Sequence, residues 1–111
     1  MNRPPSTLLI ERAVNDARAP IELRLGLQAF DAHARAVLHG FRGRLHSWTR
    51  LSDQIVLKSP AGCKKQGYQL KYKLTEAAQL ADNLFGDQGD HAVVKGAEFI
   101  CAAAEHLCCC M

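Results

Sequence analysis

The sequence of 111 residues predicts an α+β fold, mostly helical, in the order helix, helix, β-hairpin, helix, helix. Apolar residues recur in steps of three and four over residues 21–39 and 90–108, which is the spacing of an amphipathic helix. Between these segments, residues 68–74 alternate strictly, which is the period of a strand. With 48% apolar and 23% charged residues the chain has a globular composition, and we expect a single small domain over residues 1–111.

Two helices are expected before the hairpin. Ser6 is a suitable N-cap for a first helix ending near Ala17, and Pro20 is expected to break the chain. A long amphipathic helix then runs from Ile21 to a glycine stop at Gly40. Residues 41–52 show no clean period, so we expect a turn and at most one short helix there.

The hairpin prediction depends on two short segments and the turn between them. Residues 53–58 are β-branched and aliphatic, and residues 59–67 are rich in turn-forming residues. Over residues 68–74 the apolar side chains would share one face of a strand and the polar ones the other. The sequence therefore predicts a β-hairpin with a long tip.

Two further helices are expected after the hairpin. Thr75 would cap a helix to about Phe85, and residues 86–89 form a loop. The C-terminal helix, residues 90–108, carries an apolar stripe that we expect to be buried in the domain or across the two-fold axis of a homodimer. This stripe consists of Val93, Ala97, Ile100, Ala104 and Leu107.

The charge distribution is strongly uneven along the chain. Residues 32–75 contain nine basic residues and one acidic residue, whereas residues 76–111 contain one basic and six acidic residues. A basic segment of this kind attracts nucleic acid or an acidic protein surface. Alternatively, hairpin lysines protect sheet edges and keep a protein in solution. The nine expected binding residues are Arg35, Arg42, Arg44, Arg50, Lys58, Lys64, Lys65, Lys71 and Lys73.

The expected strand, basic loop and strand, followed by a helix that opens Leu74-Thr75-Glu76-Ala77-Ala78, resemble part of a known family. They are similar to the wing and following helix of bacterial winged-helix regulators, the multiple-antibiotic-resistance and arsenic-repressor types. The resemblance implies that the wing contacts the DNA backbone and that residues 90–108 dimerise. It does not extend to a recognition helix, since none is evident between Gly40 and the hairpin. By position, the wing residues would be Lys58, Lys64, Lys65, Lys71 and Lys73.

The cysteines offer a second chemistry. Cys101, His106 and the run of residues 108–110 are metal-ligand side chains, and the soft thiolates among them would suit a thiol-based metal sensor. The alternative is that cysteines on the apolar stripe pack as small hydrophobes and that the rest form a loose tail of reduced thiols. The odd number of cysteines and their crowding near one end favour reduced thiols, so we expect no metal and no cofactor.

These observations favour a non-enzymatic binding protein. No phosphate-binding glycine loop, nucleophile elbow or carboxylate pair is evident, so we do not expect an enzyme. No segment approaches the roughly 20 apolar residues of a membrane span, and we expect a cytoplasmic protein with no membrane partner. The leading hypothesis is DNA or polyanion binding by the hairpin and the arginine-rich segment, as in a transcriptional regulator. The alternatives are a protein-binding inhibitor or adaptor of the mobile-element type and a thiol-based metal sensor.

Overall fold

The structure is a computed structural model that describes residues 5–26 and 32–109, without the side chains of residues 5–7, 9–10, 24–26, 32, 34 and 103–109. No strand occurs in these residues, so the predicted α+β fold with a hairpin is wrong. The described chain is helical almost throughout. Its elements are α1 (Pro5–Gly26), α2 (Ala32–Gly40), α3 (Arg42–Lys58), a short 3-10 helix η1 (Ala61–Cys63), α4 (Lys64–Asn83) and α5 (Asp87–Cys109).

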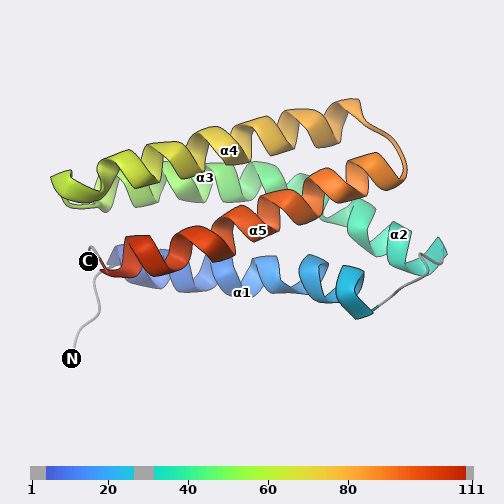
Figure 1. Ribbon diagram of the computed structural model, residues 1–111, viewed down its shortest axis with the longest axis horizontal. Coiled ribbons are helices and arrows are strands. Elements are labelled where there is room, and N and C mark those ends of the chain that lie inside the picture. Colours follow the sequence, from blue (N-terminus) through green and yellow to red (C-terminus); the bar gives the residue numbers. More distant parts are fainter. Residues whose placement is uncertain (1–4, 27–31, 110–111) are drawn as a thin grey trace.

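The four long helices form an antiparallel bundle (Figure 1). Around the bundle, α1 packs against α5, α5 against α4, α4 against α3, and α3 against α1. Each helix runs opposite to both of its neighbours, and α1 and α4 lie diagonally across the bundle. The short helix α2 lies at the end where α4 turns into α5.

The core lies along the centre of this bundle, where the buried side chains of all four long helices meet. Alanines on α1, α4 and α5 let the helix backbones approach closely around larger residues on α3. The largest buried side chain is Trp48, whose indole nitrogen Nε1 donates a hydrogen bond of 2.5 Å to Asp16 Oδ2 on α1. The principal core residues are Ala13, Ala17, Leu45, Trp48, Ile55, Leu70, Leu74, Ala77, Val93, Ala97 and Ile100.

The segments predicted as strands belong to α3 and α4. Residues 53–58 end α3, and residues 68–74 lie inside α4. The buried positions of α4 follow steps of three and four, the helical period, over Gly67, Leu70, Leu74, Ala77, Ala78 and Ala81. The alternation over residues 68–74 therefore reflects two helical rows, with Leu70 and Leu74 inside the bundle and Tyr68 and Tyr72 on its surface.

Gly67 was predicted to lie in the hairpin tip, but it marks a close approach of α3 and α4. A Cβ atom at this position would lie 2.8 Å from Val56 Cγ2, closer than real side chains pack. The absence of a side chain at Gly67 lets the two helices meet there. A glycine in a helix interior costs about 1 kcal/mol relative to alanine, and this packing offsets that cost.

Two helix boundaries also differ from the prediction. Helix α1 continues through Pro20, which is fully buried, so the predicted break there is wrong. Of the helix predicted from Ile21 to Gly40, residues 21–26 therefore belong to α1, Ala32–Gly40 form α2, and residues 27–31 lie outside the described part.

Helix α3 covers residues 41–52 almost completely, although at most one short helix was expected there. Its helical period is hard to see in the sequence because one of the buried positions is the polar Ser52. The Ser52 hydroxyl is satisfied within the helix, since it donates a 2.6 Å hydrogen bond to the Thr49 carbonyl. Thr75 lies inside α4 and donates to the Lys71 carbonyl at 2.8 Å instead of capping a helix.

The predicted C-terminal helix, residues 90–108, lies within α5. Val93, Ala97 and Ile100 are buried against the other helices of the same chain, and the side chains of Ala104 and Leu107 lie outside the described part. The described part of the stripe is therefore covered by the chain's own core, and a second copy cannot dock on it without opening the bundle.

Candidate functional site

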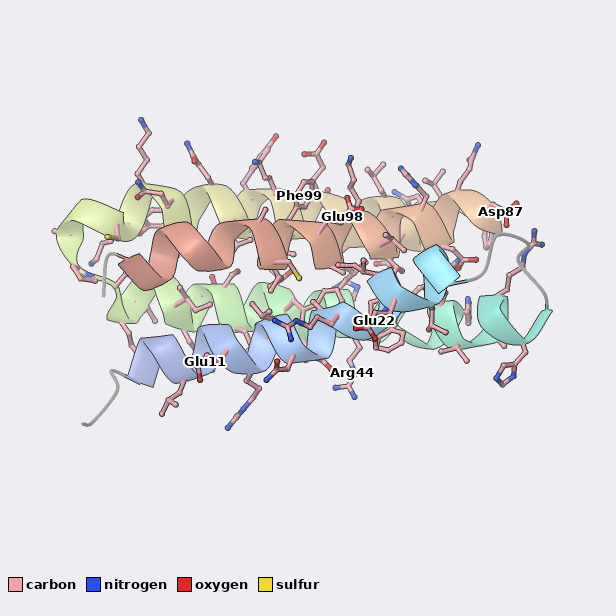
Figure 2. The ribbon with its side chains drawn as sticks, turned by 60° about the horizontal axis from the view of Figure 1, so that its bottom comes forward. Glu11, Glu22, Arg44, Asp87, Glu98 and Phe99 are labelled. Atoms are coloured by element: carbon pink, nitrogen blue, oxygen red, sulfur yellow. The ribbon has the colours of Figure 1, made fainter. Side chains whose placement is uncertain are left out.

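The nine basic residues predicted to bind together lie on several sides of the bundle. Arg35 on α2 forms an ion pair with Asp87 at the start of α5, with a distance of 2.7 Å between Nη2 and Oδ1. Arg44 on α3 faces α1, where its Nε lies 3.9 Å from Asp16 Oδ1. Figure 2 shows Arg44 beside α1, while Asp87 lies at the end of the bundle that carries α2.

Arg42 packs into the same end of the bundle as Arg35. A Cβ atom on Gly89 of α5 would collide with its guanidinium group, so the arginine lies directly over that glycine. Burial raises the pKa of the neighbouring Asp90, and the charge of Arg42 opposes that rise. Among the described residues, Arg42 Nε has no hydrogen-bond partner. Arg42 is therefore half-buried against α5, and Arg35 at the same end of the bundle is engaged in an ion pair with the chain's own Asp87.

Two other predicted residues also have partners on the surface. The Lys71 ammonium lies 2.7 Å from Asp53 Oδ1 on α3, and this hydrogen bond and ion pair raise the pKa of Lys71. Arg50 Nη2 donates a 3.2 Å hydrogen bond to Ser47 Oγ. Lys58 is exposed at the end of α3.

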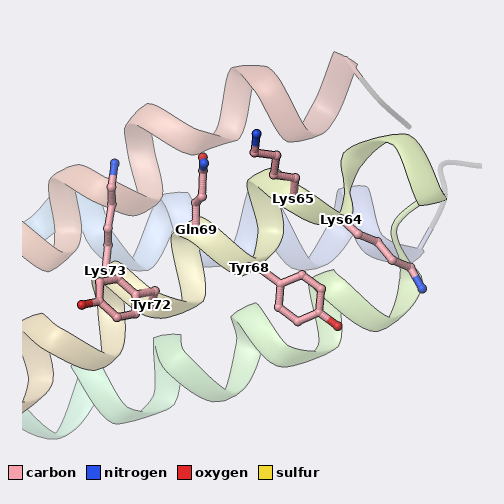
Figure 3. A pocket seen from close by; sticks show the side chains of 6 residues that line it. All are labelled: Lys64, Lys65, Tyr68, Gln69, Tyr72 and Lys73. Atoms are coloured by element: carbon pink, nitrogen blue, oxygen red, sulfur yellow. The ribbon is translucent and has the colours of Figure 1, made fainter.

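The remaining three lysines gather on the outer surface of α4. With two tyrosines and a glutamine they line an open depression (Figure 3). The residues form two rows along the helix, one on each side of the depression. Within each row, neighbouring residues are four positions apart in the sequence. In Figure 3 the row of Lys65, Gln69 and Lys73 points toward α5, and the tyrosines lie on the side of α3. We call this surface the α4 face; it consists of Lys64, Lys65, Tyr68, Gln69, Tyr72 and Lys73.

The α4 face is positively charged and contains no carboxylate. No acidic side chain in the described residues pairs with Lys64 or Lys65, and both are exposed. The Lys73 ammonium lies 5.5 Å from the centre of the Phe99 ring on α5, a cation–π contact that leaves its charge uncompensated. Tyr68 and Tyr72 are 57% and 71% exposed. Among the described residues, the surface thus combines three lysines that have no acidic partner with two accessible aromatic rings.

The sequence prediction included the lysines of this face and missed its tyrosines. Tyr68 and Tyr72 were assigned to the apolar face of a strand, together with Leu70 and Leu74. The signal that identifies them is the helical row of Lys64, Tyr68 and Tyr72, each four residues from the next.

A second concave surface lies between α4 and α5. It is a groove of about 320 Å³ whose floor includes Leu80, Leu84, Ala92 and Phe99. Leu80 is 47% exposed. Charged and titratable side chains around this apolar floor include Lys73, Glu76, His91 and Lys95. The groove is continuous with the α4 face because Lys73 lines both.

The cysteines differ from the expectation of reduced thiols. Cys63 in η1 is buried and disulfide-bonded, whereas Cys101 is free and half-buried. Burial raises the pKa of the Cys101 thiol, which keeps it protonated near neutral pH. The described residues contain no group of three His, Cys, Asp or Glu side chains that could hold a metal ion, and the predicted ligands at residues 106 and 108–110 lie outside the described side chains.

The described helices include none that is long and apolar enough to cross a membrane. Comparisons of the chain with protein-family models, curated proteins and solved structures found no match.

Proposed function

We propose that this protein is a small, non-enzymatic binding protein that holds nucleic acid, or another polyanion, on the α4 face. The observation that supports this proposal is the placement of Tyr68 and Tyr72, both largely exposed, among three lysines without an acidic partner in the described residues. Large aromatic side chains are costly to leave in water, and cations beside them favour an anionic ligand with flat rings. The predicted wing is not part of this proposal, since the two segments predicted to be its strands lie in the helices α3 and α4.

The expected binding is electrostatic in large part and therefore sensitive to salt. Each phosphate neutralised by a lysine releases counterions and contributes roughly 0.7–0.9 to the slope of log affinity against log salt. Three lysines predict a slope of about −2 to −3 and an affinity in the weak, non-specific range, with Kd on the order of 10⁻⁴ to 10⁻⁶ M. Helix α4 is packed between α3 and α5, so we do not expect it to enter the major groove or to read the base sequence strongly.

The test is a titration of labelled nucleic acid at several salt concentrations. We expect the double variant Lys64→Gln/Lys65→Gln to flatten the salt slope by about 1.4–1.8. The matched control is Arg12→Gln/Arg18→Gln, which removes the same charge from exposed positions on α1, the helix diagonally opposite α4. The control should keep the slope of the unsubstituted protein. Equal slopes in both variants, or no binding at low salt, would contradict the proposal.

Because nucleic acid is the proposed ligand, we also propose a cytoplasmic location. Disulfides are uncommon in that compartment, so the Cys63 disulfide makes the location testable. Thiol labelling of the protein in intact cells, before and after reduction, should show whether Cys63 is oxidised there. A fully oxidised Cys63 would argue for a different compartment.

The second candidate is a protein-binding inhibitor or adaptor, and the groove between α4 and α5 favours it. Its apolar floor and the cations Lys73 and Lys95 suit an amphipathic helix with acidic flanks. Leu80→Glu would place a carboxylate on that floor. If the groove is the functional surface, this variant should lose a partner that co-purifies after nuclease treatment and should keep its nucleic-acid affinity.

A further inference from the structure

We infer that the ligand of the α4 face is a single strand of nucleic acid whose bases stack on Tyr68 and Tyr72. This inference rests on the proposed function and narrows it from polyanions in general to unpaired strands.

The exposure of the two tyrosine rings is the first reason to expect an unpaired strand. Lysines alone suffice to hold a phosphate backbone, and tyrosine rings add little to that contact. Aromatic rings bind nucleic acid through the flat faces of the bases, which a duplex hides between neighbouring base pairs. Tyr68 and Tyr72 are both mostly exposed on this face, so they are accessible to bases that have left a stack.

The spacing of the two tyrosines along the helix is the second reason to expect an unpaired strand. Four residues of an α-helix advance about 6 Å along its axis. Successive bases of a duplex strand are stacked about 3.4 Å apart. Two neighbouring bases therefore cannot each lie flat on a different tyrosine ring while they remain stacked on each other. Bases of an extended, unpaired strand can separate, and each can rest on its own tyrosine.

The second row of the α4 face is placed to hold the strand's backbone. Lys65 and Lys73 lie eight residues apart, which is about 12 Å along the helix, and Gln69 lies between them. Their ammonium groups and the Gln69 amide all donate hydrogen bonds, and phosphate oxygens accept them. At 3.4 Å or more per nucleotide this length spans about two to four nucleotides. The bound segment is therefore short, with backbone on one row and bases on the other.

The experiment compares four ligands. Three are single strands with the same number of phosphates, namely a thymine 12-mer, a uracil 12-mer as the RNA arm and an abasic strand of that length, and the fourth is a duplex of 12 base pairs whose affinity is expressed per strand. We expect the base-bearing single strands to bind at least tenfold more tightly than the abasic strand and the duplex, because stacking acts only where free bases are present.

Three variants separate stacking from charge. Tyr68→Ala/Tyr72→Ala should lower the affinity for the base-bearing strand to that of the abasic strand and leave the abasic strand and duplex unaffected. Tyr68→Phe/Tyr72→Phe keeps the rings and should keep most of the affinity. Phe85→Ala, which removes an aromatic ring that is 82% exposed outside the α4 face, is the matched control and should change no affinity. Circular dichroism of each variant checks that the bundle is intact.

The outcomes distinguish this inference from the proposed function. If the abasic strand, the duplex and the base-bearing strand bind alike, and the tyrosine variants match the unsubstituted protein, the ligand is a general polyanion and the inference is overturned. Binding to none of the four ligands, even at low salt, overturns the proposed function as well. Tighter binding to the uracil strand than to the thymine strand identifies RNA as the preferred ligand and supports the inference.

Discussion

The inner and outer faces of α4 both carry large side chains within the same short stretch of helix but differ in their exposure to solvent. Leu70 and Leu74 are almost completely buried, whereas Tyr68 and Tyr72, each only two residues from a leucine, are mostly exposed. Residues two positions apart on a helix point to nearly opposite sides. Substitutions on the inner face should therefore change the stability of the bundle, whereas substitutions on the outer face should leave it nearly unchanged and affect only the proposed binding.

The largest expected effect tests this separation directly. Leu74→Ala removes a fully buried side chain from the core and should lower the free energy of unfolding by about 2–5 kcal/mol in urea titrations. Tyr72→Ala, the matched change on the outer face, should lie within about 0.5 kcal/mol of the unsubstituted protein. Similar losses in both variants would mean that the two side chains share one face, as they would in a strand.

An intermediate effect concerns the contact between α3 and α4. Gly67→Ala would place a methyl group against Val56 and should cost about 1–3 kcal/mol of packing, of which about 1 kcal/mol is offset by better helix propensity. Adding Val56→Ala should restore part of the loss, and a double-mutant cycle measures this coupling. Gly62→Ala is the control, because a Cβ there has no neighbour within 4 Å. A cycle without coupling would contradict the close contact.

The smallest expected effect concerns the surface pair between α3 and α4. Asp53 raises the pKa of Lys71 above its ordinary value of 10.5. A lysine with a raised pKa in the folded state stabilises the fold fully below its unfolded pKa, and this contribution is lost as pH rises through the folded pKa. Stability should therefore fall more steeply above about pH 10.5 in the unsubstituted protein than in Asp53→Asn. Parallel pH curves for the two proteins would show that the pair adds nothing.

The sequence was informative near the C-terminus, where a helical pattern extends over many residues. The C-terminal helix was predicted because its apolar stripe repeats over residues 90–108, and the structure contains a helix there. The hairpin prediction failed because seven alternating residues are compatible with two helical rows, and only the longer pattern from Gly67 to Ala81 distinguishes them. In α3 a buried serine concealed the stripe, since its hydroxyl is satisfied within the helix.

The candidate site could be predicted only in part, for a different physical reason. A count of charges identifies a basic segment but does not show which cations are neutralised. Arg35 meets Asp87, and Lys71 meets Asp53, through contacts that exist only once the helices have packed. When the paired cations are left out of the count, the lysines of the α4 face are those without an acidic partner in the described residues. The tyrosines beside them could be recognised only after α4 was known to be a helix.

The single tryptophan of the chain gives the bundle a built-in optical reporter. Trp48 is fully buried, and its indole N–H is hydrogen-bonded to α1. Separating α1 from α3 would bring water to the indole ring and shift its fluorescence to longer wavelength. The α4 face contains no tryptophan, so a ligand seated there should leave the emission wavelength unchanged. The colour of this one fluorophore therefore reports whether the bundle is closed, independently of whether its outer surface is occupied.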